Sequence, residues 1–241
     1  MRPVDISRKL NVSTTTLRNY EDFGMIPNVA RTTSGHRVYT EEHFAYFTCI
    51  REMLAGFSLT HISKILKEVM AKKINSALWM ANHTQAELHR EKIISKKISL
   101  NLLHKSERPI STKQELLTIN DVSRETGIPV TTIRYWDKVG LISAKRCAGN
   151  NYRMFAAEHV RKALIIYALK LSFYANGQKH YIENIKEDLK GFDYNNKSKI
   201  KEMTKGIEQY LDQANRAQIK GISALYRLCV QVEANSFDTQ I

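Results

Sequence analysis

The sequence has little of what would make it fibrous, disulfide-linked or membrane-embedded. Ten Gly and 4 Pro among 241 residues are too few for a collagen-like or low-complexity chain. The 3 cysteines, Cys49, Cys147 and Cys229, lie far apart without a CxxC motif. This argues against a disulfide framework and favours a reducing, cytosolic compartment. No run approaches the roughly 18 apolar residues of a membrane span, and the opening MRPVDISRKL lacks a signal peptide's apolar stretch.

The motifs of common enzyme and metal sites are also missing. The sequence contains no P-loop, GxGxxG, HExxH or GxSxG pattern, so the usual nucleotide-binding, zinc-protease and serine-hydrolase chemistries have no candidate residues. His83 and His89 are six positions apart, on different faces of a helix, and a zinc site needs a richer set of ligands. We therefore expect no enzymatic activity, no metal site and no cofactor.

What the chain does have is an excess of positive charge. Lys and Arg number 37 against 24 Asp and Glu, which gives a net charge of +13 and a pI near 9.6. A pI above about 9 is typical of nucleic-acid-binding domains, although a well-solvated basic surface has the same composition. A membrane surface fits less well, because no single stretch is both strongly basic and strongly apolar.

The sequence also repeats itself at a fixed offset. Residues Asp5–Ile26 align without a gap on Asp121–Ile142, 116 positions later. Most of the other pairs are conservative, and the same offset still holds at Arg37 and Arg153. One module has therefore been used twice. The identical pairs in the first stretch are Asp5/Asp121, Ser7/Ser123, Arg8/Arg124, Thr15/Thr131, Thr16/Thr132, Arg18/Arg134, Gly24/Gly140 and Ile26/Ile142.

Each copy of the repeat predicts two short helices followed by a hairpin. Apolar spacing predicts a first helix over 4–10, and Ser13 is a natural N-cap for a second helix. In the second copy Pro129 suits a helix start because it needs no hydrogen-bond partner for its nitrogen. Gly24 fits the position after the second helix, and the polar TSG before HRVYT indicates a two-stranded hairpin. The module therefore predicts a winged helix-turn-helix.

These residues resemble the MerR-type transcription regulators, a bacterial-type family. The first copy carries the resemblance in Thr16–Pro27, in the wing sequence Gly35–Tyr39 and in Gly56–Ile62. The second copy carries it in Thr132–Ile142 and Asn151–Phe155, but it lacks the Gly-Phe-Ser-Leu turn. We therefore expect its auxiliary helices to pack differently.

The resemblance implies a mainly α-helical fold with two winged helix-turn-helix domains, each with a small β-hairpin wing. Long coiled-coil-like helices join and follow these domains. The expected segments are 1–70 for the first winged domain, 71–116 for a long helix and linker, 117–178 for the second winged domain and 179–241 for a C-terminal helical segment.

A helix in the major groove reads bases with exposed side chains near its N-terminus. Arg18 and Arg134 suit guanine, but they can instead contact phosphates or pair with Glu21 and Asp137. The family usually has two aromatics after this Arg, and Asn19 replaces one of them in the first copy. The resemblance implies that the wing arginines, Arg37 and Arg153, contact phosphates or the minor groove. Tyr20 and Tyr39 suit either packing in the core or contact with the DNA. The candidate DNA-binding residues are Thr14, Thr15, Arg18, Asn19, Tyr20, His36, Arg37, Tyr39, Val130, Thr131, Arg134, Tyr135, Tyr152 and Arg153.

Two stretches keep a heptad-like spacing of apolar residues, from Ile74 to Leu102 and from Leu211 to Val232. Family members dimerise through a long helix at this place. The two stretches can pair within one chain as a monomeric pseudo-dimer, or they can pair between the chains of a homodimer, and each can also simply cover its own module. Ser106-Glu107-Arg108-Pro109 is expected to end the first long helix, because Pro cannot continue it.

The leading functional interpretation is a sequence-specific regulator that binds double-stranded DNA and reads two unequal half-sites. RNA polymerase is left open as a second partner, and the expected location is the cytoplasm, at the nucleoid. The alternative is an architectural DNA-binding protein without an RNA polymerase role. For an effector, a small pocket lined by Trp79, Phe173, Tyr174 or Tyr181 is conceivable, but aromatic side chains of this kind usually pack in the core.

Overall fold

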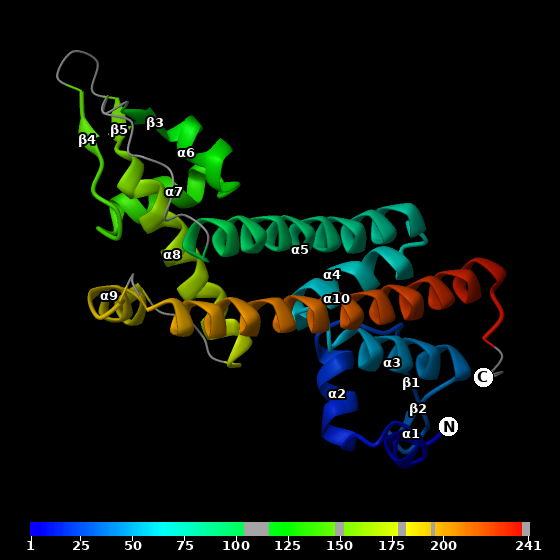
Figure 1. Cartoon of the computed structure of the whole chain (residues 1–241). Helices are drawn as coiled ribbons and strands as arrows, with labels where there is room; N and C mark the ends of the chain where they lie inside the picture. Colours follow the sequence, from blue (N-terminus) through cyan, green and yellow to red (C-terminus); the bar gives the residue numbers. More distant parts are fainter. Residues whose placement is uncertain (104–115, 148–151, 178–181, 194–195, 238–241) are drawn as a thin grey trace. The chain divides into compact units, whose positions relative to one another are not determined.

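The computed structural model describes residues 1–103, 116–147, 152–177, 182–193 and 196–237. By internal contacts the chain forms two compact units. Unit 1 holds residues 1–88 and 213–241, and unit 2 holds residues 89–212. Each of the two long helices drawn in Figure 1 contributes residues to both units. The four consecutive segments expected from the sequence stay a prediction.

The first module, in unit 1, contains the predicted helix-turn-helix and wing. Ser13 caps the second helix by accepting a hydrogen bond from the Thr16 backbone at 3.0 Å. Gly24 follows that helix with a φ of 62°, a left-handed conformation that glycine adopts without strain. The elements are α1 (Pro3–Leu10), α2 (Thr14–Asp22), β1 (Ala30–Arg31), β2 (Arg37–Val38), α3 (Glu41–Met53) and α4 (Leu59–Met70).

The second module, in unit 2, has the same order of elements and one additional strand. Leu117 pairs with Phe155 in the added β3, which lengthens the wing into a three-stranded sheet of order β3-β5-β4. We did not predict this strand. Its counterpart in the first module is a reciprocal pair of hydrogen bonds between Met1 and Tyr39. The Tyr39 N–H donates to the Met1 carbonyl at 3.0 Å, and the Met1 amino group donates to the Tyr39 carbonyl. The elements are β3 (Leu117–Thr118), α6 (Ile119–Thr126), α7 (Val130–Lys138), β4 (Lys145–Arg146), β5 (Arg153–Phe155) and α8 (Ala157–Ala175).

The two modules match at the level of individual contacts. The Ser7 hydroxyl donates to the Val12 carbonyl, and the Ser123 hydroxyl donates to the Ile128 carbonyl. A histidine Nδ1 also accepts a backbone N–H at 3.0 Å in both modules, three residues into α3 and α8. The repeat in the sequence therefore encodes one structure twice. The matching buried pairs are Ile6/Val122, Leu17/Ile133, Tyr20/Trp136, Met25/Leu141, Ile26/Ile142 and Tyr39/Phe155.

The modules diverge where the Gly-Phe-Ser-Leu turn is missing from the second copy. In the first module α3 ends at Met53 and α4 begins at Leu59, capped by Ser58. In the second module α8 continues without a break from Ala157 to Ala175. The expected difference in the auxiliary helices is therefore confirmed, because without glycine and the capping serine the helix runs through this position.

Two long helices, α5 (Ile74–Leu103) and α10 (Lys197–Ala234), account for the heptad-like stretches, and a short α9 (Ile182–Lys190) precedes α10. The predicted seam positions face inward. In α5 Ala77, Leu88 and Ile98 are buried, and in α10 Leu225 and Val232 are buried. The expected end of the first long helix at Ser106–Pro109 lies outside the described residues.

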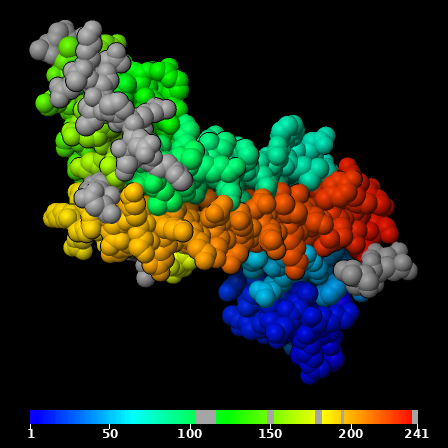
Figure 2. All heavy atoms as spheres, in the orientation of Figure 1, coloured from blue at the N-terminus to red at the C-terminus, as the bar shows by residue number. Residues whose placement is uncertain are grey.

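In unit 1 the C-terminal half of α10 closes the core of the first module. Leu225 and Leu228 belong to the same buried cluster as Phe47 of α3, and in Figure 2 the orange and red surface of α10 adjoins the cyan surface of α3 and α4. The backbones approach closely, because a Cβ added at Gly56 would lie 2.6 Å from the Gln218 nitrogen. The first half of α5 also contacts α10 here through a 2.8 Å hydrogen bond between Gln85 and Gln218.

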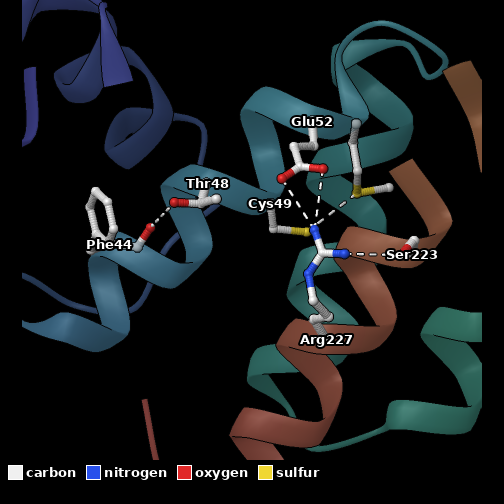
Figure 3. Close-up of polar contacts among 7 residues, drawn as sticks. Phe44, Thr48, Cys49, Glu52, Ser223 and Arg227 are labelled. Atoms are coloured by element: carbon white, nitrogen blue, oxygen red, sulfur yellow. Dashed lines mark hydrogen bonds and ion pairs between the residues drawn. The ribbon is translucent and has the colours of Figure 1, made fainter. Parts of the chain in front are cut away.

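An ion pair at the edge of this core joins α10 to α3. The Arg227 guanidinium donates to both carboxylate oxygens of Glu52 at 3.2 Å and also to the Ser223 hydroxyl at 3.0 Å. Figure 3 shows the guanidinium between these partners, beside the buried Cys49. Because the pair is partly exposed, it fixes the position of α10 more than it stabilises the fold.

In unit 2 the second half of α5 covers the second module in a corresponding way. A Cβ at Gly127 would lie 3.2 Å from Ile94 Cγ1, and Lys97 Nζ donates to the Arg124 carbonyl at 3.0 Å. The helix also contacts α10 within this unit, where Lys92 Nζ lies 2.8 Å from Asp212 Oδ1. Each module is therefore covered by a long helix that follows the other module in the chain, and the expectation that each helix covers its own module was incomplete.

The aromatic side chains considered for a pocket lie in different surroundings. Trp79 is 70% exposed, so core packing was the wrong expectation for it. At this position α5 turns its other face, with Ala77 and Ala81, into the core. Phe173 and Tyr174 are half-buried on α8, and Tyr181 lies outside the described residues.

Replacing Gly56 by Ala should destabilise the protein. The added methyl would meet the α10 backbone at 2.6 Å, so the helix must shift, and overpacking of this kind costs about 1–3 kcal/mol. Urea unfolding followed by circular dichroism measures the loss. Gly206→Ala on α10 is the matched control: its Cβ has nothing within 4 Å, and the change should stabilise by about 0.5–1 kcal/mol. Equal effects of the two variants would contradict the packing described.

The three thiols should differ sharply in reactivity. Cys147 is exposed, whereas Cys49 and Cys229 are buried. Burial raises the pKa of Cys229 to about 11 and raises the pKa of Cys49 further, which suppresses the reactive thiolate. A chromogenic aromatic disulfide at pH 8 should titrate one thiol rapidly in the native protein and two more only after unfolding. Cys147→Ser should remove the rapid phase, and more than one rapid thiol would be inconsistent with this core.

Candidate nucleic-acid interface

The second helix of each module has one buried face and one exposed polar face. In α2 the side chains of Leu17 and Tyr20 face the core, while Thr15, Arg18 and Asn19 are exposed and Thr14 is half-buried. The division follows from the helical period, because residues three apart share a face. The four polar candidates of the first module therefore lie together on one outer surface.

The second helix-turn-helix repeats this arrangement with different chemistry. In α7 Thr131, Arg134 and Tyr135 are exposed, and Val130 is half-buried at the first helical position. Tyr135 leaves 49% of its surface exposed, because Trp136 fills the core position next to it. The exposed face of α7 is therefore more apolar than that of α2.

The arginines of these faces are free, since their nearest acids have other partners. Glu21 Oε2 accepts from Arg37 Nε at 2.6 Å, and Asp137 Oδ2 accepts from Arg153 Nε at 2.6 Å. In the first module Arg31 of the wing also lies 3.8 Å from Glu21 Oε1. The alternative pairing of Arg18 with Glu21 and of Arg134 with Asp137 is therefore not formed. Within the described part of the chain neither exposed arginine has a hydrogen bond or ion pair.

The wing arginines have a role that the sequence interpretation missed. Arg37 and Arg153 were expected to contact DNA. In the structure the Nε of Arg37 holds the first wing against α2, and the Nε of Arg153 holds the second wing against α7. The hydrogen bond to Glu21 also raises the pKa of the Arg37 guanidinium. The repeat contained the signal, because an acid and an arginine recur 16 positions apart in both copies.

Tyr20 and Tyr39 pack in the core, one of the two places that the sequence left open for them. Tyr20 is 6% exposed and Tyr39 is 1% exposed. The ring of Tyr39 packs edge-on against Phe47 with centroids 5.2 Å apart. Burial raises the pKa of the Tyr39 hydroxyl. Contact of either hydroxyl with DNA stays a prediction.

The wings present different residues at matching positions. His36 is exposed in the first wing, and Tyr152 is 67% exposed in the second. Beside the first wing a groove of about 880 Å³ opens between the start of α1, the recognition helix and the hairpin. It is lined by Arg2, Arg18, His36 and Arg37 among others, so it suits an anionic backbone. Arg2 was not among the predicted residues, because the sequence does not show that the chain start lies beside the wing.

Metal sites and membrane spans have no candidates in the described ranges. His, Cys, Asp and Glu side chains do not gather there in threes that could hold a metal ion. A helix able to span a bilayer is not found among the described residues either.

Comparison with known proteins agrees with this geometry. The family model of the MerR HTH family regulatory proteins matches residues 1–69 and 117–177. These two ranges contain the two helix-turn-helix modules and their wings. No solved structure matches the chain.

The curated relatives are regulators. An HTH-type transcriptional regulator, YyaN, of Bacillus subtilis is 29% identical over 124 residues, which is 49% of this chain and 90% of the relative. The regulator HmrR of Rhizobium leguminosarum is 44% identical over 46 residues, 19% of this chain and 35% of the relative. The mercuric resistance operon regulatory protein of Bacillus cereus is 35% identical over 63 residues, 26% of this chain and 48% of the relative. With both modules matched by the family model, the chain belongs to the MerR family of DNA-binding helix-turn-helix transcription regulators, which are not enzymes.

Proposed function

We propose that this protein is a sequence-specific regulator that reads two unequal half-sites of one operator with the recognition helices α2 and α7. The observation that carries the proposal is an exposed arginine at the same position of both helices, Arg18 and Arg134, which the acid three residues later does not pair with, because that acid holds a wing arginine. Arginine pairs bidentately with guanine in the major groove. Double-stranded DNA at the nucleoid is the partner that this geometry fits.

The half-sites should differ because the two reading faces differ. The first face offers Thr14 and Asn19, and the second offers Val130 and Tyr135 at the matching positions. Asn pairs bidentately with adenine, whereas Val has no hydrogen-bonding group. An operator with two identical half-sites would leave one face poorly matched.

A single chain supplies both readers in this proposal. The contacts within each unit support a monomeric pseudo-dimer, because the surface of each module that needs a covering helix already has one. The first is covered by α10 around Leu225, and the second by α5 around Ile94. A second copy is not needed to close either core. The proposal of RNA polymerase as a further partner rests on the regulator role alone, and no contact among the described residues adds to it.

Alanine substitution at the two free arginines tests base reading. Arg18→Ala and Arg134→Ala should each weaken binding to a selected operator by about 1–3 kcal/mol, roughly 5- to 160-fold, with little loss against random DNA. Fluorescence anisotropy with both duplexes at several salt concentrations measures this. Arg216→Ala, an exposed arginine on α10 outside both modules, is the control and should bind normally.

The same titrations separate the competing roles. If each variant loses affinity for all duplexes alike and the salt slope falls by about one, the arginines are phosphate contacts. If the unmodified protein discriminates between selected and random DNA by much less than about 10³, the protein is an architectural binder and the regulator proposal fails. Unchanged binding in both variants would remove α2 and α7 from the interface.

The mass of the free protein tests the one-chain proposal. Light scattering at the concentrations used for binding should give a particle near 27.8 kDa, because both cores are closed within the chain. A stable particle of twice that mass would mean a homodimer with four readers and would contradict the pseudo-dimer.

A further inference from the structure

One pair of matching positions in the reading faces differs by a single group of atoms. Thr14 begins α2 and Val130 begins α7, and both side chains are half-buried. Thr and Val have nearly the same shape, but Thr carries a hydroxyl where Val carries a methyl. This position can therefore change what a helix reads without changing how the helix sits.

The place of Val130 on α7 puts it beside the residue that we assign to guanine. Val130 and Arg134 are four apart, so their side chains are neighbours along one row of the helix surface. Thr14 and Arg18 have the same relation on α2. A base contacted by Val130 would thus lie next to the guanine contacted by Arg134, on the side toward the start of the helix.

Residues other than Val130 and Tyr135 supply the fully buried side of α7. Ile133 and Trp136 are its buried residues, while Tyr135, which follows Arg134 in the chain, exposes 49% of its surface. The matching residue in the first module is the exposed polar Asn19. The second reading face therefore offers Val130 and Tyr135 where the first offers Thr14 and Asn19, so the second face is the more apolar of the two.

Major-groove chemistry limits what such a face can recognise. Base edges there offer hydrogen-bond donors and acceptors, and the one apolar group is the C5 methyl of thymine. A valine can only gain from contact with that methyl. We infer that Val130 is a specificity-determining residue, and this inference rests on the function proposed above. Val130 selects a thymine next to the guanine of the second half-site by contacting the C5 methyl of that thymine.

Replacing thymine by deoxyuridine tests this inference, because it removes the methyl and leaves base pairing intact. The operator is first selected from random duplexes with the full chain. Each thymine in turn is then replaced by deoxyuridine, and affinity is measured for the unmodified protein, Val130→Thr and Thr14→Val. One position in one half-site should lose about three- to fivefold in affinity, the effect expected of one buried methyl.

The two variants assign that loss to residues. Val130→Thr should make binding insensitive to deoxyuridine at that position, and Thr14→Val should gain a methyl preference in the other half-site. Thr14→Val carries the test by itself if Val130→Thr does not fold.

Three results would overturn the inference while leaving the regulator proposal intact. These are a selected half-site without thymine beside the guanine, a loss on methyl removal that persists in Val130→Thr, and equal losses in both half-sites. Loss of all discrimination between selected and random DNA is a different outcome, which would overturn the proposed function and this inference together.

Discussion

The arrangement depends on how each small module closes its hydrophobic core. A module of about 60–70 residues buries only about 60% of the surface of its unfolded chain and is marginally stable by itself, so a helix that covers its open side adds apolar burial that stabilises it. For the first module that helix is α10, which enters the buried cluster with Leu225 and Leu228 and approaches the backbone at Gly56. For the second module it is α5. Each module is thus covered in part by the long helix that follows the other module, and the stability of the first module depends on residues of α10 that lie far away in sequence.

The reading surfaces follow from a second, local constraint. An acid at the end of each recognition helix holds an arginine of the wing, at 2.6 Å in both modules. Since the acid is occupied, the arginine on the exposed face of each helix has no hydrogen bond or ion pair among the residues that the structure describes. The same ion pair therefore positions the wing and leaves Arg18 and Arg134 available for a polyanion. Both modules share this ion pair but differ in the residues around it, and the proposed difference in preference between the two readers rests on those residues.

Much of the fold could be predicted because its signals are local. Ser13 as a cap, Gly24 as a helix stop and the inward spacing of Leu17 and Tyr20 act within a few residues. Because the sequence repeats, the same helix-turn-helix prediction could be made for the second module. The two long helices could also be predicted, since the residues that recur at heptad-like spacing are the ones that are buried.

The features that were missed depend on contacts distant in sequence. The choice between core and interface for Tyr39 is decided by Phe47 and by strand pairing, and β3 exists only because Leu117 meets Phe155. Trp79 was expected in the core because of its residue type, whereas the orientation of α5 decides its exposure. The exchange of covering helices leaves no local signal at all, so it emerged only from the folded chain.

The central claim is that one polypeptide supplies both readers to one duplex. Native mass spectrometry of the full chain bound to a selected operator measures this directly. The account predicts a complex of one chain of 27.8 kDa with one duplex, and that composition should persist when protein is in excess. A complex that contains two chains on each duplex would contradict it.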